Sequence, residues 1–483
     1  MTATLRVTEA RGRWVLLATV LGSSMAMLDG TVVNLALPRL AEDLDASFAG
    51  LQWILNGYTL ALAALILLGG GLGDRFGRRR MFVAGAVAFT LASVLCAASV
   101  NVPMLIGARV AQGVAAAILT PGSLALIEAS FVPGDRGRAI GTWSGLGGVA
   151  TAIGPFLGGW LVDAASWRWI FLLNVPLGIA VVAVAVRHVP ESRDPNAPGR
   201  LDVSGTVFGA AALAGLTLGL TEESWPLAGA GVVLIVGFLI AEQRSAHPLV
   251  PLSLFSSRTF AGTNAVTLLL YGAFGAVFFL LGLVLQGPLG YTPLQAGAAT
   301  VPITIAMLLL SARAGQLADR IGPRIPMTLG PLVVAASMLL LTRIDATSSY
   351  VADVLPGVVL FGLGLALTVA PLTATALGAV DDEHAGVASG VNNAVARTGQ
   401  LLAVAAIPAV AGFAPGDAVG SDALVAGFHT VMRVAAAMTA VAAVVAWTTV
   451  RRPAPGAGEA AGWHCAAGGP PAAVPEEATT PSG

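Results

Sequence analysis

The chain has 483 residues, of which 56% are hydrophobic and only 11% charged, and its formal net charge is −1. Soluble domains carry about 25% charged residues, so this composition excludes a soluble globular protein. All 25 basic residues are arginines, and the lack of lysine excludes P-loop nucleotide hydrolysis and lysine Schiff-base chemistry. The mean hydropathy of +0.82 and the 59 glycines indicate packed membrane helices instead.

Fourteen apolar runs approach the length of about 20 residues that a helix needs to cross the hydrocarbon core of a bilayer. They lie at 14–37, 52–72, 82–100, 104–126, 139–162, 168–187, 203–221, 227–241, 260–285, 295–316, 327–343, 354–377, 387–411 and 425–449. Arginines precede the first run as in a signal peptide, but no small-residue cleavage site follows, so we interpret this run as a retained helix. Residues 451–483 are rich in Pro, Gly and Ala and are predicted to form a disordered tail.

The arginines predict the orientation, because short cytoplasmic loops hold an excess of positive charge. With both termini in the cytoplasm, 18 of the 25 arginines fall on the cytoplasmic side. Only Arg39, Arg168 and Arg343 then fall on the outer side. We therefore expect a multi-pass protein of the plasma or inner membrane with both termini in the cytoplasm.

A loop sequence occurs twice in the chain. Residues 70–79 read Gly-Gly-Leu-Gly-Asp-Arg-Phe-Gly-Arg-Arg, and residues 315–324 read Gly-Gln-Leu-Ala-Asp-Arg-Ile-Gly-Pro-Arg. Glycine permits a tight turn, and Asp and Arg can pair across neighbouring helix ends, so both loops are candidate latches of a conformational change. The topology rule alone would explain the arginines but not the repeated order. The candidate gating residues are Gly70, Asp74, Arg75, Gly77, Arg78, Gly315, Asp319, Arg320 and Gly322.

This loop resembles the signature of the major facilitator superfamily, which lies between the second and third helices and is often echoed in the second half. Residues 28–38, Leu-Asp-Gly-Thr-Val-Val-Asn-Leu-Ala-Leu-Pro, resemble the helix-1 motif of its fourteen-helix drug:proton antiporters. Arg109, Gln112 and Gly113 resemble the helix-4 motif. Glycines around Gly154 and Pro155 resemble the helix-5 antiporter motif, although Ala150 replaces its usual middle glycine.

The resemblance implies an all-α integral membrane protein with the major facilitator fold and 14 transmembrane helices arranged as 6+2+6. Eight apolar runs separate the two loops, so 203–221 and 227–241 would be the two extra helices. The expected parts are a cytoplasmic segment 1–13, a six-helix bundle 14–187, loops with two inserted helices 188–259, a second six-helix bundle 260–450 and the cytoplasmic tail 451–483.

Asp29 is the one carboxylate deep within a predicted span, where a charge costs roughly 2.5–3.5 kcal/mol unless it is protonated, paired or hydrated. Helix arithmetic places Asp29 and Arg109 at similar heights in the outer half of the membrane. We predict that Arg109 pairs with deprotonated Asp29 and is released when the acid is protonated or when a cationic substrate displaces it. The resemblance implies the same proton-coupling roles. The alternatives for Asp29 are a purely structural ion pair or a place in a broad outer vestibule. The alternative for Arg109 is a side chain that reaches the outer interface.

The remaining candidates are a gating hinge and the residues of a substrate cavity. Gly154-Pro155 removes a backbone hydrogen bond in mid-helix and is predicted to kink the helix as a gating hinge, with a plain packing kink as the alternative. In the family this pattern marks exporters. The predicted cavity residues are Asn34, Asn56, Tyr58, Tyr271, Phe278 and Arg397. Contacts with lipid or neighbouring helices, and a structural role for Arg397, are the alternatives.

Together these features predict a proton-coupled antiporter that exports hydrophobic or amphipathic small molecules, such as drugs or antibiotics, by alternating access. A proton-coupled symporter and an exporter of one endogenous metabolite remain open. A membrane-embedded enzyme is disfavoured, because the sequence contains no His-Glu-x-x-His or Gly-x-Ser-x-Gly motif. We expect no catalytic residue, metal or cofactor beyond the proton motive force. The expected partners are the substrate, protons and the lipid bilayer, without nucleic acid, and the chain is expected to be a monomer.

Overall fold

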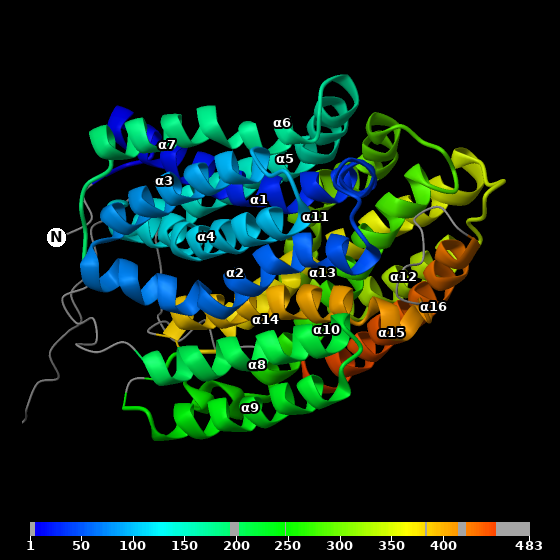
Figure 1. Ribbon diagram of the computed structural model, residues 1–483. Helices are drawn as coiled ribbons and strands as arrows, with labels where there is room; N and C mark the ends of the chain where they lie inside the picture. The colour runs from blue at the N-terminus through cyan, green and yellow to red at the C-terminus, as the bar shows by residue number, and fades with distance from the viewer. Residues whose placement is uncertain (1–4, 194–201, 247, 382–383, 414–421, 451–483) are drawn as a thin grey trace, which may run out of the picture. The chain divides into compact units, whose positions relative to one another are not determined.

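The computed structural model describes residues 5–193, 202–246, 248–381, 384–413 and 422–450, and this part of the chain is helical (Figure 1). The first helices are α1 (Ala10–Leu44), α2 (Phe48–Phe76), α3 (Arg78–Ala97), α4 (Val102–Ser130), α5 (Pro133–Ala164), α6 (Arg168–Leu172) and α7 (Asn174–His188), followed by α8 (Val203–Thr221) and α9 (Trp225–Arg244). The later helices are η1 (Leu252–Ser256), α10 (Arg258–Gln286), α11 (Pro293–Ile321), α12 (Arg324–Leu341), η2 (Tyr350–Val354), α13 (Leu355–Gly378), α14 (Ala385–Ala405), α15 (Ile407–Ala411) and α16 (Asp422–Thr449). The predicted tail lies outside the described residues.

Twelve helices in the described part of the chain are long and apolar enough to cross a membrane, counting α6 with α7 and η2 with α13. α5 and α14 coincide with predicted runs but are not among these twelve. Their lengths of 32 and 21 residues correspond to about 48 and 32 Å, so length is not what sets them apart. Polar side chains such as Asn392, Asn393 and Arg397 lower the hydropathy of α14. Fourteen crossings therefore stay a prediction.

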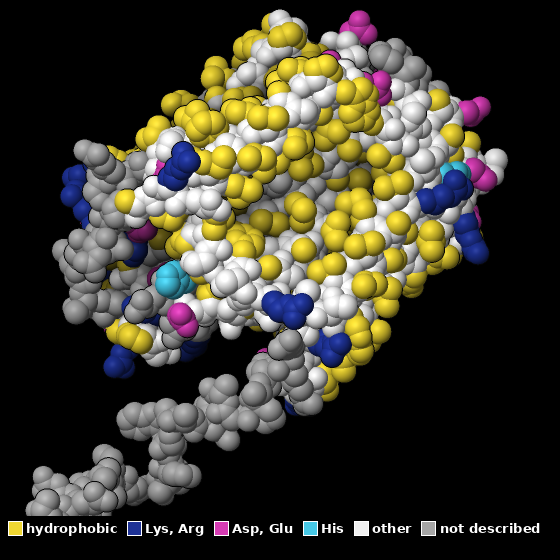
Figure 2. Space-filling view, turned by 90° about the horizontal axis from the view of Figure 1, so that it is seen from below, with side chains coloured by type: hydrophobic (Ala, Val, Ile, Leu, Met, Phe, Trp, Pro, Cys, Tyr) yellow, Lys and Arg dark blue, Asp and Glu magenta, His cyan; other side chains and the backbone are white. Residues whose placement is uncertain are grey.

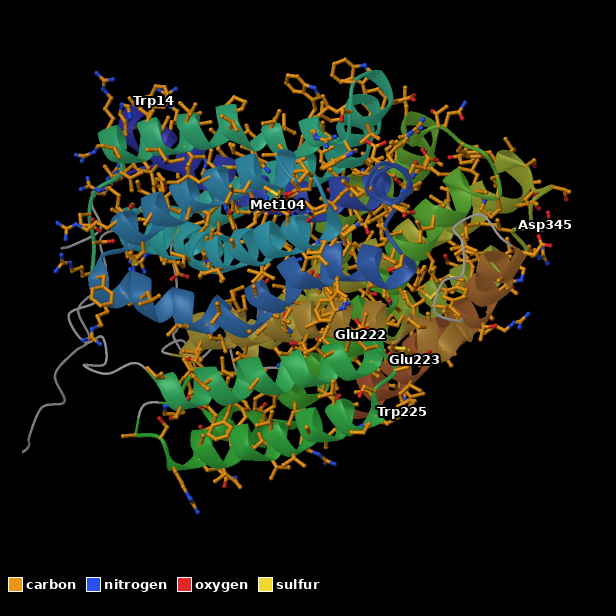
Figure 3. The ribbon with its side chains drawn as sticks, viewed as in Figure 1. Trp14, Met104, Glu222, Glu223, Trp225 and Asp345 are labelled. Carbon is orange, nitrogen blue, oxygen red and sulfur yellow. The ribbon has the colours of Figure 1, made fainter. Side chains whose placement is uncertain are left out.

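The side chains on the surface suit a bilayer. Hydrophobic side chains spread over much of the face shown in Figure 2, while most acidic and basic side chains lie toward its edges. Figure 3 shows exposed Trp14 near one end of the helices, and exposed Trp225 near the other end, beside Glu222 and Glu223. Tryptophan favours the interface between lipid and water, so these residues mark both boundaries of the apolar band.

Helix ends follow from local sequence. Ser47 accepts a hydrogen bond from the Gly50 backbone N–H at 3.2 Å and so begins α2, and Thr292 begins α11 in a capping box with Gln295. Gly77 has φ +112° and lies between α2 and α3 without a further linking residue. Gly322 has φ +88° and ends α11 in the same way. L-residues with a side chain rarely adopt these angles, which explains the recurring glycine of both loops.

Both loops lie at one end of the helices, which we call the motif end. α5 and α11 are antiparallel, since the Cβ of an alanine at Gly297, near the start of α11, would lie only 2.3 Å from Pro155 O in the last third of α5. The described N-terminal residues also lie at the motif end, because Leu5 N donates to Ser130 O, the last residue of α4. The side of the membrane that this end faces stays a prediction.

Helices from distant parts of the sequence pack together. Within the first part α4 packs on α2 and α3, and α1 on α5 and α7, while in the later part α10 packs on α14 and α16, and α13 on α11 and α12. Contacts between these two groups run mainly through α5–α11 and α2–α14, and to a smaller extent through α1–α10. The hairpin of α8 and α9 lies over α2 and α14, at the bottom of Figure 1.

The largest apolar core lies at the end opposite the motif end and joins the two groups of helices. Phe48 at the start of α2 packs edge-on against Phe279 of α10 and Phe413, with ring centroids 5.5 and 4.9 Å away. Gln286 Nε2 donates to Leu35 O of α1 at 3.1 Å. The two groups of helices are therefore closed against each other at this end.

Candidate functional site

A buried ion pair connects α1 and α4. Asp29 and Arg109 form a salt bridge in which each side chain is only 1% exposed. The Arg109 guanidinium also donates to Ile54 O of α2 at 3.1 Å. An arginine this deeply enclosed does not reach the interface, so the alternative of a snorkelling Arg109 is wrong. Because both charges are shielded from bulk solvent, each depends on its protein partners for stabilisation.

Polar side chains from α3, α4 and α7 complete a buried network around the pair. Gln112 Nε2 donates to Asp29 at 2.7 Å, and Gln112 Oε1 accepts from Arg109 at 2.6 Å. Ser93 Oγ accepts from Gln112 Nε2 at 2.9 Å and from Asn174 Nδ2 at 3.2 Å. We call these five residues the charge network. Sequence reasoning missed the roles of Gln112, Ser93 and Asn174, although Gln112 lies one helical turn after Arg109.

The aromatic wall of the charge network includes one predicted cavity residue. The Arg109 guanidinium lies over the Tyr58 ring, 4.4 Å from its centroid, and 5.8 Å from the centroid of Phe171. Tyr58 donates its hydroxyl to Ala26 O at 3.4 Å and is 3% exposed. Asn56 is also buried, and its amide nitrogen has no hydrogen-bond partner among the described residues. Neither Asn56 nor Tyr58 lines either of the two cavities described below, and their place in a substrate cavity stays a prediction.

A cavity of about 180 Å³ lies between the two groups of helices, in the half near the motif end. Its lining residues are Met27, Tyr271, Thr373, Ala376, Leu377, Ser389, Asn392, Asn393, Ala396 and Arg397. Thr373 and Leu377 lie in the last turns of α13, and Ser389 in the first turns of α14. The predicted residues Tyr271 and Arg397 thus meet in one cavity. Asp29 is absent from this lining, since it lies two residues after Met27 and about 200° around the helix.

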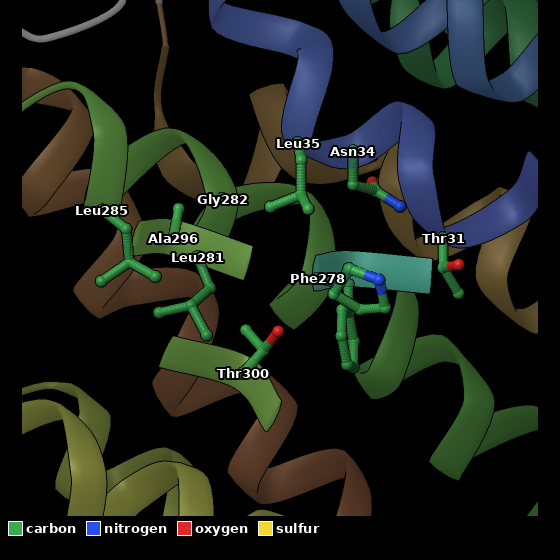
Figure 4. Close-up of a pocket in the computed structure, with 10 residues that line it drawn as sticks. Thr31, Asn34, Leu35, Phe278, Leu281, Gly282, Leu285, Ala296 and Thr300 are labelled. Atoms are coloured by element: carbon green, nitrogen blue, oxygen red, sulfur yellow. The ribbon is translucent and has the colours of Figure 1, made fainter. Parts of the chain in front are cut away.

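A second and much smaller cavity, of about 20 Å³, lies toward the opposite end. Figure 4 shows Thr31 and Asn34 of α1 beside Phe278 of α10 and Thr300 of α11. The predicted residues Asn34 and Phe278 both line it. It has room for about one water molecule, so α1, α5, α10 and α11 are nearly closed around it.

The sequence profile of the Major Facilitator Superfamily matches residues 19–404. The chain belongs to this superfamily. With twelve apolar helices among the residues that the structure describes, it is a multi-pass transporter of the cell membrane.

Several relatives of this chain are named for antibiotic resistance or export. It is 36% identical over 419 residues to the tetracenomycin C resistance and export protein of Streptomyces glaucescens, covering 84% of this chain and 78% of the relative. It is 34% identical over 466 residues to the puromycin resistance protein of Streptomyces alboniger, covering 92% of each chain. The crystal structure of a D-xylose–proton symporter covers 92% of this chain and 99% of its own, with a TM-score of 0.66 and 17% identity. That last likeness concerns the fold alone.

The superfamily loop after α2 is held by charged contacts. Arg78 pairs with Asp74 at 2.7 Å, one turn earlier in sequence, and its backbone N–H donates to Ser192 O at 2.9 Å. Glu191 lies 3.7 Å from Arg79 and accepts from its backbone N–H at 3.1 Å. The segment after α7 is therefore tied to this loop, a contact that the loop sequence alone did not indicate.

The second loop is built differently. Pro323 occupies the place of Arg78, so the same pair with Asp319 cannot form. Arg324 instead lies over the Trp447 ring of α16, 3.9 Å from its centroid. Of the other predicted gating residues, Arg75, Asp319 and Arg320 are exposed, and Gly70 and Gly315 are half-buried. The gating role of both loops stays a prediction.

Gly154 and Pro155 lie inside the continuous helix α5. The Cβ of an alanine at position 154 would lie 2.6 Å from Thr31 Oγ1 of α1. The Cβ of an alanine at Gly297 of α11 would likewise lie 2.3 Å from Pro155 O. The pair thus lets one helix approach two others, while its action as a hinge stays a prediction. No group of three or more His, Cys, Asp or Glu side chains in the described ranges is arranged to hold a metal ion.

Proposed function

We propose that this transporter is a proton-coupled antiporter that exports hydrophobic or amphipathic small molecules, antibiotics among them, from the cytoplasm. The observation that carries the proposal is the buried salt bridge between Asp29 and Arg109. A carboxylate enclosed in membrane helices is stable only while it is paired or protonated. Proton uptake by Asp29 would end its attraction to Arg109 and change the packing of α1 against α4.

The names of the relatives support export of antibiotics. One relative is named for resistance to tetracenomycin C and its export, and another for puromycin resistance. The packing of the helices supports alternating access, since the described helices are closed at the opposite end and hollow near the motif end. We propose that the motif end faces the cytoplasm and that this arrangement receives the substrate from inside.

The proposed topology has fourteen crossings, with α5 and α14 added to the twelve apolar helices. The packing of α8 and α9 as a hairpin over α2 and α14 is what an insertion between two six-helix bundles, 14–187 and 260–450, would produce. Both termini would then lie in the cytoplasm. We further propose that the chain works as a monomer and draws its energy from the proton motive force, without a cofactor.

Cysteine labelling of intact cells tests the topology. In a Cys465→Ser background, Glu223→Cys at the turn between α8 and α9 is expected to react with a membrane-impermeant maleimide, whereas Arg80→Cys after the first loop is expected to react only after permeabilisation. Both positions are exposed, and the remaining Cys96 is buried. The reverse pattern of labelling would overturn the orientation.

Asp29→Asn tests the coupling. In everted membrane vesicles, the unaltered chain is expected to accumulate tetracenomycin C when a pH gradient is imposed and to release protons in exchange. The asparagine side chain has no titratable proton, so the variant is expected to lose gradient-driven accumulation while it still exchanges substrate for substrate. Asp345→Asn, in an exposed loop, is the matched control and is expected to behave like the unaltered chain. Accumulation by Asp29→Asn that still follows the gradient would refute the coupling role.

A further inference from the structure

The cavity between the two groups of helices carries one charge. Arg397 of α14 is the only charged residue among the ten that line it. The Arg397 guanidinium donates to Gln400 Oε1 at 3.3 Å, and no carboxylate of the described residues lies within salt-bridge distance of it. The charge of Arg397 is therefore left without a counter-ion inside the described part of the protein.

The other polar side chains of the cavity are largely committed to helix packing. Asn392 Nδ2 donates to Thr267 at 2.8 Å and to Asn264 at 3.1 Å, both on α10. Asn393 Nδ2 donates to Ser389 O, and Thr373 donates to Val369 O, one turn back in their own helices. These bonds position the amides and the hydroxyl but leave few donors for a ligand.

Among the described residues that line the cavity, three donor groups remain available to a ligand: the guanidinium of Arg397 and the hydroxyls of Tyr271 and Ser389. Tyr271 lines the same cavity as Arg397, and its hydroxyl makes no hydrogen bond within the described residues. Arginine has five N–H donors in a planar fork that fits the two oxygens of a carboxylate or of an ionised β-diketone. A half-buried guanidinium beside a hydroxyl donor, in a cavity without acids, therefore favours an anionic oxygen group and repels a cation.

We infer that Arg397 is the anion-binding residue of the substrate cavity, and that the exported molecules carry a carboxylate, phenolate or enolate on an apolar skeleton. Met27, Ala376, Leu377 and Ala396 supply the apolar contacts for that skeleton. This inference rests on the proposed function, since it takes the cavity to be the substrate site. It replaces the expectation that a cationic substrate displaces Arg109, because Asp29 and Arg109 are enclosed outside the cavity.

Three probes of equal size separate charge from shape: 1-naphthoate, neutral 1-naphthamide and 1-naphthylmethylammonium. Equilibrium dialysis of the full chain in zwitterionic nanodiscs, corrected with empty nanodiscs, gives the three dissociation constants. We expect 1-naphthoate to bind about tenfold or more tightly than the other two, as a charge-assisted hydrogen bond would provide. Arg397→Gln is expected to abolish this preference, and Arg397→Lys to keep part of it, since the charge stays but the fork is lost.

Two further variants distinguish anion binding at Arg397 from a general effect of the protein's charge. Arg433→Gln removes the same charge from an exposed position on α16 outside the cavity and is expected to leave binding unchanged. Asn393→Asp adds an acid to the cavity lining, one turn from Arg397, on an exposed position where the fold tolerates it. It is expected to weaken 1-naphthoate binding and strengthen that of the ammonium, even if Arg397→Gln should fail to fold.

Equal binding of the three probes, tighter binding of the ammonium, the absence of saturable 1-naphthoate binding, or unchanged binding by Arg397→Gln would each overturn the inference. The binding assay requires no proton gradient, so its result is independent of the coupling assay with Asp29→Asn. If 1-naphthoate binds selectively but transport does not depend on the gradient, the proposed proton coupling is refuted and the proposed anion site is supported.

Discussion

Gln112 and Asp29 are joined across two helices by a hydrogen bond of 2.7 Å from the glutamine amide nitrogen to the carboxylate. The same Gln112 accepts from Arg109 through its amide oxygen. Gln112 therefore contacts both members of the ion pair. Under the proposed coupling, in which Arg109 separates from Asp29, the bond from Gln112 would keep the carboxylate partly satisfied. A coupling pair that separates and re-forms needs such a third group, because a buried charge without any hydrogen bond costs several kcal/mol.

Gln112→Leu is the first prediction. The leucine removes a donor from Asp29 and an acceptor from Arg109 at nearly constant volume, so we expect a loss of about 2–4 kcal/mol in the free energy of unfolding. The midpoint of thermal unfolding in detergent would show it. Gln316→Leu, at an exposed position of α11, is the control and is expected to leave the midpoint unchanged. A Gln112→Leu midpoint equal to that of the control would mean that the amide does not stabilise the pair.

The two members of the ion pair are predicted to respond unequally to removal. Arg109→Gln leaves a carboxyl that can take up a proton, whereas Asp29→Asn leaves a guanidinium that cannot lose one. We therefore expect Asp29→Asn to lose about 3 kcal/mol and Arg109→Gln clearly less. The double variant is expected to recover part of the loss, with an interaction energy of about 1–3 kcal/mol. Unfolding by SDS in mixed micelles measures all three, and strictly additive losses would speak against a direct interaction.

The depth of residues in the membrane could be predicted from sequence, but their direction around the helix axis could not. A fixed rise of 1.5 Å per residue places Asp29 and Arg109 at one height, and the structure places them in contact. The same arithmetic gave no reason to turn Tyr58 toward Arg109 rather than toward the cavity. A single sequence contains no information on which neighbour each face of a fully apolar helix meets, so Ser93 and Met27 were missed.

Helix positions were predictable and helix ends less so. The run predicted at 203–221 coincides with α8, whereas the run at 14–37 lies within α1, which extends from Ala10 to Leu44. Hydropathy marks the stretch inside the hydrocarbon, while backbone hydrogen bonds continue the helix into the polar boundary. The sequence also showed that residues 315–324 repeat the first loop. It could not show the contact of Arg324 with Trp447, because Trp447 lies in α16, more than a hundred residues later.

Gly77→Ala is predicted to destabilise the first loop. Its φ of +112° is strained for alanine, and the added Cβ would lie 2.8 Å from Glu191 Oε1. We expect a loss of about 1–2 kcal/mol, seen as a lower thermal midpoint. Gly73→Ala is a matched control one turn earlier in α2, where no atom lies within 4 Å of the added Cβ. Equal midpoints of the two variants would show that the turn at Gly77 accommodates a side chain.

The last prediction concerns the closed end of the helices. The added Cβ of Gly297→Ala would lie 2.3 Å from Pro155 O, a backbone atom that cannot rotate away, so α11 must move from α5. We expect the variant to shift the population toward an arrangement that is open at this end, and to slow export. Spin labels at Asp163→Cys and Ala298→Cys, both exposed, report the α5–α11 separation by pulsed electron paramagnetic resonance in a Cys465→Ser background. A longer distance population is expected for Gly297→Ala but not for Gly141→Ala, whose Cβ meets no atom within 4 Å. An unchanged distance distribution with normal transport would mean that this contact does not control the opening.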